Sequence, residues 1–170
     1  MGQESFVYGG IVGARWNVAN PHRLQQLNQQ IVATLPTTDD WPFLTRQMFT
    51  LPGADPADGL YRSQLIHFGA TFKEIEWEWD LWLAKFEHLL GQLFWEEVYL
   101  HLRTEATVGD YDYLYKALDA IPSFLEHESP VPAGLWRFSG GPRKFDPDVL
   151  TDEREREQVW LYSDGRWQIE

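Results

Sequence analysis

Tyr61-Arg-Ser-Gln-Leu-Ile-His-Phe-Gly-Ala-Thr-Phe72 begins the most informative part of the chain, which continues to Glu105. Apolar side chains occupy alternate positions here, at Ile66, Phe68, Ala70 and Phe72. Alternation with a period of two is typical of a strand that buries one face. We therefore expect a strand over residues 61–72.

The spacing of the apolar residues changes to the helical period after this strand. Steps of three or four residues separate Ile75, Trp79, Trp82, Phe86, Leu89, Leu90 and Leu93. Such steps place side chains on one stripe of a helix. Acidic residues in the first turns complement the positive end of the helix dipole. The pattern predicts an amphipathic helix over residues 75–93, with Trp82 and Phe86 in the core.

The same two periods predict the other elements before Glu105. Alternating residues predict a strand over residues 98–105, and two further strands are expected over residues 6–12 and 45–51. Asn20 is a suitable N-cap and Pro21 suits the first helical position, so a helix is expected over residues 20–35.

The predicted order is strand, helix, strand, strand, helix, strand, which is the order of a ferredoxin-like βαββαβ core. In this α+β fold an antiparallel sheet carries two helices on one face. We expect residues 1–105 to form this core, and residues 106–170 to form an aromatic-rich extension within the same single domain.

Within the extension, residues 110–121 admit two interpretations. Asp110 can cap a helix that buries Tyr111, Leu114, Tyr115 and Leu118, but the alternation of Tyr111, Tyr113 and Tyr115 also fits a strand. The helix is favoured because Lys116-Ala-Leu-Asp-Ala is poor strand sequence. A short strand is expected over residues 135–138. The chain then ends in a β-hairpin, with strands over residues 158–162 and 166–169 around Ser163-Asp-Gly165, and its aromatic side chains are expected to cover part of the sheet.

Charge limits the classes of partner. The 170 residues include 14 Lys plus Arg and 26 Asp plus Glu, which gives a net charge of −12. Nucleic acid is not expected as a ligand because its binding depends on neutralising phosphates with Lys and Arg, so a basic protein surface is the better match. The alternative is that acidity serves only solubility. With no Cys, no apolar run of membrane-spanning length and no recognisable signal peptide, we expect a protein of the bacterial cytoplasm without a membrane partner.

No catalytic motif stands out. The sequence contains neither His-Glu-x-x-His nor His-x-His, and it lacks the glycine-rich phosphate loops and the Gly-x-Ser-x-Gly elbow. We therefore predict no catalytic residues, no metal ligands and no cofactor. His67, His101, Arg103 and Glu105 are expected on the sheet face away from the helices. They support an alternative function, that of a small ligand-binding or enzymatic domain.

A partner-binding surface is predicted where aromatic and acidic residues meet. Trp77 lies off the apolar stripe of its helix and between acidic residues, although it can equally pack beneath the loop after Leu51. An aromatic side chain surrounded by carboxylates suits an interface with a basic partner. The aromatic ring supplies buried area, and the carboxylates steer association. The predicted contact residues are Glu74, Glu76, Trp77, Glu78, Asp110 and Asp112.

Three segments carry a family resemblance. Ile66-His-Phe-Gly-Ala-Thr-Phe-Lys-Glu-Ile-Glu, Trp82-Leu-Ala-Lys-Phe-Glu-His-Leu-Leu and Val98-Tyr-Leu-His-Leu-Arg-Thr-Glu105 resemble small immunity proteins of bacterial polymorphic toxin systems. The resemblance covers a minor part of the chain. It implies a cytoplasmic α+β protein without catalytic machinery that binds and neutralises a cognate toxin. A nuclease toxin, whose cleft is basic, fits an acidic inhibitor best.

Overall fold

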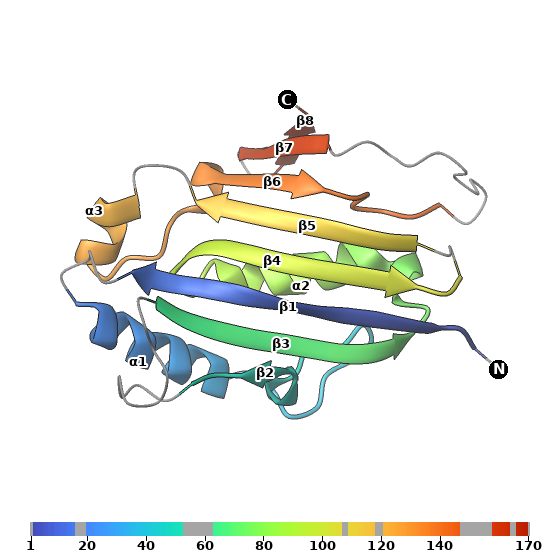
Figure 1. Ribbon diagram of the computed structural model, residues 1–170, viewed down its shortest axis with the longest axis horizontal. Coiled ribbons are helices and arrows are strands. Elements are labelled where there is room, and N and C mark those ends of the chain that lie inside the picture. The colour runs from blue at the N-terminus through green and yellow to red at the C-terminus, as the bar shows by residue number, and fades with distance from the viewer. Residues whose placement is uncertain are drawn as a thin grey trace.

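One antiparallel sheet of eight strands organises the computed structural model, which describes residues 2–15, 20–52, 63–106, 109–117, 121–146, 158–163 and 166–169. The strands lie side by side in the order β2-β3-β1-β4-β5-β6-β7-β8 (Figure 1). The predicted α+β class and antiparallel sheet are confirmed. The last four strands of the chain continue the sheet that its first four strands begin. The strands are β1 (Glu4–Arg15), β2 (Phe49–Thr50), β3 (Ser63–Lys73), β4 (Trp95–Thr104), β5 (Gly109–Ala117), β6 (Trp136–Gly140), β7 (Gln158–Ser163) and β8 (Arg166–Ile169).

Both predicted helices are present, but they begin or end at residues other than the predicted ones. Helix α1 (Pro21–Ala33) begins with the proline at its first position, as predicted. The second begins as a 3-10 turn, η3 (Ile75–Glu78), continues as α2 (Trp79–Leu90), and ends before Gly91. The described residues also include three shorter helical segments: η1 (Arg46–Met48), α3 (Ile121–Glu126) and η4 (Ala133–Leu135). Among the described residues, no helix combines the length and the apolar character needed to cross a bilayer.

Helix α2 packs its predicted apolar stripe on the sheet, and Figure 1 shows it behind β4 and β1. Trp79, Trp82 and Phe86 are completely buried. Their rings form a continuous stack, with centroid separations of 5.2 Å between Trp79 and Trp82 and 5.1 Å between Trp82 and Phe86. Val32 of α1 joins the same core. The sheet contributes one face to it, including Val7, Ile11, Ile66, Phe68, Val98, Leu100, Leu102, Tyr113, Tyr115 and Phe138.

The helix predicted over residues 110–121 is wrong for the described part of that segment, because Gly109–Ala117 forms strand β5 between β4 and β6. Tyr113 and Tyr115 are buried and contact the aromatic stack of α2, with centroids 5.5 Å from Trp79 and 6.2 Å from Phe86. Pairing on both sides and burial of these rings outweigh the low strand propensity of the Lys116 region.

The boundaries of the other strands differ from the predicted ones. Strand β2 is shorter than the predicted strand because η1 occupies its first part. Strands β7 and β8 pair antiparallel with each other, and β7 extends the sheet beyond β6. The expected turn at Asp164 and Gly165, and the aromatic side chains expected to cover the sheet, lie outside what the structure describes.

Candidate functional site

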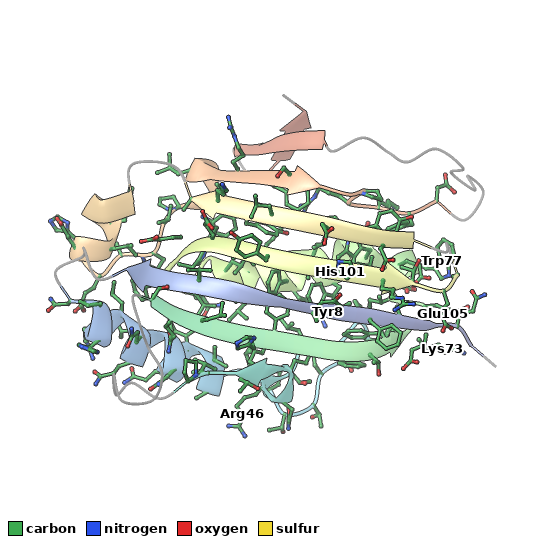
Figure 2. All side chains as sticks on the ribbon, in the orientation of Figure 1. Tyr8, Arg46, Lys73, Trp77, His101 and Glu105 are labelled. Carbon is green, nitrogen blue, oxygen red and sulfur yellow. The ribbon has the colours of Figure 1, made fainter. Side chains whose placement is uncertain are left out.

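The sheet face opposite α2 carries a row of polar and aromatic side chains. No described helix or strand lies over this face, which is turned toward the viewer in Figure 1. The strand register pairs Tyr8 of β1 with His101 of β4, and His101 with Asp112 of β5. Because directly paired residues place their side chains on the same face, these three lie in a row across three strands. Tyr8 and His101 are neighbours in Figure 2.

His101 is held between two aspartates. Its Nδ1 lies 2.6 Å from Oδ1 of Asp112, and its Nε2 lies 3.2 Å from Oδ1 of Asp110. On its other side the ring packs against Tyr8, with a centroid separation of 4.8 Å. A neutral imidazole donates from one nitrogen, whereas the protonated ring donates from both. The arrangement therefore fixes the imidazole and attaches it to two carboxylates, which themselves remain on the surface.

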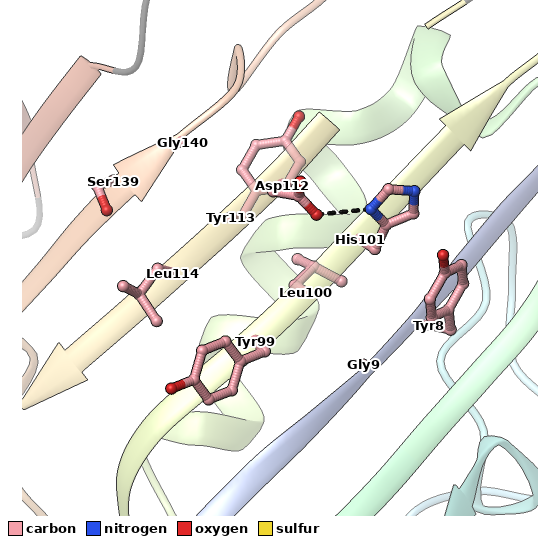
Figure 3. A pocket seen from close by; sticks show the side chains of 10 residues that line it. All are labelled: Tyr8, Gly9, Tyr99, Leu100, His101, Asp112, Tyr113, Leu114, Ser139 and Gly140. Atoms are coloured by element: carbon pink, nitrogen blue, oxygen red, sulfur yellow. Dashed lines mark hydrogen bonds and ion pairs between the residues drawn. The ribbon is translucent and has the colours of Figure 1, made fainter. Parts of the chain in front are cut away.

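A pocket of about 410 Å³ lies beside this row, and we call it the sheet-face pocket. Figure 3 shows side chains from β4, β5 and β6 around it, with Tyr8 of β1 at its far side. Polar groups meet apolar surface here, which is the usual character of a ligand-binding cavity. The lining residues are Tyr8, Gly9, Tyr99, Leu100, His101, Asp112, Tyr113, Leu114, Ser139 and Gly140.

Two glycines allow the backbones beneath the pocket to approach closely. A Cβ on Gly9 would overlap the carbonyl oxygen of Tyr99, and a Cβ on Gly140 would overlap the carbonyl oxygen of Asp112. Gly140 also has φ +141°, a conformation that residues with a Cβ rarely adopt. Replacement of either glycine would therefore displace the strands that carry the pocket.

The rings of Tyr8 and Tyr99 are half exposed, each at 51%. Tyr99 is nevertheless fixed at its outer end, where its hydroxyl donates a 2.6 Å hydrogen bond to Glu97 Oε2. The Nζ of Lys116 lies 3.8 Å from the other carboxylate oxygen of Glu97, Oε1. The polar tip of Tyr99 is thus already bonded, while much of its surface stays accessible to a ligand.

A second surface combines aromatic and acidic groups at the end of β3. Trp77 is half buried against the main core and, with Trp41, lines a shallow depression of about 300 Å³ that we call the Trp77 pocket. The remaining lining residues are Lys73, Glu74 and Glu78. Glu74 has φ 54°, which is unusual for a residue with a side chain, and it turns the chain from β3 into η3.

The structure thus divides the predicted contact residues into three groups. Asp110 and Asp112 lie together at His101, whereas Glu74, Trp77 and Glu78 lie at the Trp77 pocket. The prediction of Glu76 as a surface contact is wrong, because its side chain is completely buried. The irregular 3-10 turn directs it inward, which acidic composition alone does not reveal.

Sequence reasoning missed Tyr8 and Tyr99. Tyr8 lies in Phe6-Val-Tyr-Gly-Gly-Ile11, where nearly every side chain is apolar or absent, so the exposed set cannot be recognised. Tyr99 alternates with Val98 and Leu100, and that alternation was the available signal for an exposed aromatic residue.

The pocket does not assemble a hydrolytic triad. Ser139 of β6 and His101 of β4 are separated by β5, and two strand spacings amount to roughly 10 Å. A nucleophile and its base need hydrogen-bonding contact. Nor do His, Cys, Asp and Glu side chains, among the residues that the structure describes, form a group of three suited to a metal ion. The geometry instead favours binding by aromatic surface and carboxylates.

Comparison of the chain with protein-family models, with curated proteins and with solved structures finds no match.

Proposed function

We propose that this protein binds and neutralises a basic protein toxin through the open face of its sheet, as immunity proteins do. The observation that carries the proposal is the combination of half-exposed Tyr8 and Tyr99 with exposed Asp110 and Asp112 around one fixed imidazole. Aromatic side chains of this kind are frequent hot spots of protein interfaces. The sheet behind them is anchored by a fully buried aromatic core, so the surface is presented rigidly.

Charge supports a basic partner. The net charge of −12 attracts a cationic surface at a distance, and the carboxylates on the sheet face bring the attraction to the interface. Glu74, Trp77 and Glu78 provide a second contact of the same chemistry at the edge of the molecule. A nuclease, whose active site binds phosphates with basic residues, is the proposed class of toxin.

The proposal extends to fold and location. The first four strands lie in the order β2-β3-β1-β4, with α1 and η3–α2 between them along the chain, and we take this part as a ferredoxin-like unit widened by the later strands. A cytoplasmic inhibitor would meet its toxin inside the cell.

A second candidate is a small ligand-binding or enzymatic domain. The sheet-face pocket favours it, since a 410 Å³ cavity with a fixed imidazole has room for a small molecule. The two functions differ in what the exposed carboxylates meet, which is a basic protein surface in the first and a small molecule in the second.

Co-expression tests the proposed function. The test uses a nuclease toxin gene found next to the gene for this protein. Cells that produce that toxin should survive with the wild-type protein and die with a Tyr8→Ala, Tyr99→Ala double variant. Leu81→Ala is the matched control, because it truncates a 55% exposed apolar side chain on α2. With purified proteins, the association rate should fall as salt rises, and loss of the aromatic anchors should mainly speed dissociation. Failure of the wild type to protect contradicts the function, whereas equal protection by folded variants contradicts the proposed surface.

A further inference from the structure

We infer that the sheet-face pocket accepts an arginine side chain of the partner, with the guanidinium group on the Tyr99 ring and paired with Asp112. The inference rests on the proposed function, for which it names the recognised group. It starts from the charges of the pocket: Asp112 lines it, and no lysine or arginine is among the described lining residues. The Asp112 side chain is 87% exposed, so a ligand can reach its carboxylate although one oxygen contacts His101.

The aromatic surface favours a cation that is weakly hydrated, because the cation must lose water to stack on a ring. Guanidinium is weakly hydrated and planar, so it stacks on a ring while donating hydrogen bonds in its own plane. The compact ammonium group of lysine is strongly hydrated and lacks this geometry. Leu114, which pairs with Tyr99 across β4 and β5, supplies apolar surface for the methylene stem of an arginine.

The protein already uses this combination on the other side of the sheet. The Arg143 guanidinium lies 4.8 Å from the centre of the Phe138 ring and forms a 2.7 Å ion pair with Glu87. An aromatic ring from one strand and a carboxylate from a neighbouring element thus hold an arginine of this chain. Tyr99 and Asp112 present the same two chemical groups, an aromatic ring and a carboxylate, on the open face.

His101 orients the carboxylate for this role. Its Nδ1 contact with Asp112 and its ring contact with Tyr8 hold Asp112 at the mouth of the pocket. Asp110, on the other imidazole nitrogen, adds negative charge next to it. An anionic ligand would be repelled, and an apolar ligand would leave the carboxylate poorly solvated.

Titration with N-acetylarginine amide, followed by NMR, tests the inference. N-acetylcitrulline amide is the matched probe, since it has nearly the same shape without the charge. We expect the Tyr99 and His101 ring signals to shift with the arginine probe at millimolar concentrations, less with N-acetyllysine amide, and not with the citrulline probe. Asp112→Asn should weaken arginine binding by about two- to fivefold, as expected for loss of an ion pair at a solvent-exposed carboxylate.

Glu126→Gln, which removes one charge at an exposed position of α3, is the control and should leave arginine binding unchanged. Equal shifts with arginine and citrulline, or unchanged binding by folded Asp112→Asn, would overturn the inference. If the wild type protects cells but the arginine probe does not bind, the pocket assignment fails and the neutralising function stands. If arginine binds through Asp112 and protection is absent, the pocket assignment stands and the proposed function fails.

Discussion

The hydroxyl of Ser5 donates a 2.5 Å hydrogen bond to the carboxylate of Glu76, 71 positions along the chain. Both side chains are completely buried. The bond joins β1 to the turn that precedes α2, and it makes Glu76 part of the interior. The other carboxylate oxygen, Oε1, has no hydrogen-bond partner among the described residues. Buried polar groups are costly unless paired, so Ser5 has a specific structural role.

Loss of the Ser5 hydroxyl should destabilise the fold. Ser5→Ala leaves the buried Glu76 carboxylate without its donor, and we expect the free energy of unfolding to fall by about 1–3 kcal/mol. Urea denaturation measures this change. Ser129→Ala, at an exposed position after α3, should change stability by less than about 0.5 kcal/mol. Equal stability of Ser5→Ala and wild type would show that the bond contributes nothing.

Truncation of the aromatic stack should lower the free energy of unfolding more than the loss of the Ser5 hydroxyl does. Phe86 is completely buried and contacts Trp82, Phe68 and Tyr115. Phe86→Ala removes these contacts and leaves a cavity, so we expect a loss of about 3–5 kcal/mol, measured by thermal or chemical denaturation. Leu81→Ala on the exposed side of α2 is the control. A melting temperature unchanged by Phe86→Ala would contradict the packing of α2.

Two glycines should respond differently to alanine. Gly140→Ala forces a Cβ onto the Asp112 carbonyl oxygen in a backbone conformation with φ +141°, and we expect it to cost about 1–3 kcal/mol or more. Gly91 has φ −64° at the end of α2, and a Cβ there meets only ordinary contacts. Gly91→Ala should therefore be neutral or stabilising by about 0.4–1 kcal/mol. Chemical denaturation compares the pair, and a similar loss in both variants would contradict the assigned strain.

The free energy of unfolding at alkaline pH should depend on the buried Tyr115. Burial raises the pKa of this tyrosine well above its usual 10.0, and the neighbouring Glu87 charge raises the pKa further, while Arg143 opposes the effect. The folded state holds the phenol proton more tightly than the unfolded state, so the stabilisation is complete below about pH 10 and is lost as pH rises further.

Tyr115→Phe removes this proton linkage while keeping the ring. Its free energy of unfolding should decline less steeply above about pH 10 than that of the wild type, and tyrosinate absorbance should show one less late-titrating group. Identical slopes in the two proteins would contradict the linkage.

Several elements follow from the sequence because local periodicity reports burial directly. The stripe through Trp82 and Phe86 predicts the position and core face of α2, and alternation around Phe68 predicts β3. For Gly109–Ala117, the local signals for helix and strand compete, and burial of alternate tyrosines against α2 determines the outcome.

The candidate site depends on contacts between segments far apart in the chain. Alternation identifies which side chains of one strand share a face, because that relation is a property of the local backbone. It does not specify which strand lies next to it. Strand pairing places Tyr8, His101 and Asp112 in one row, while the inward turn at η3 buries Glu76. Strand order and burial arise from the packing of the whole sheet on α2, and they decide which acidic residues lie on the surface.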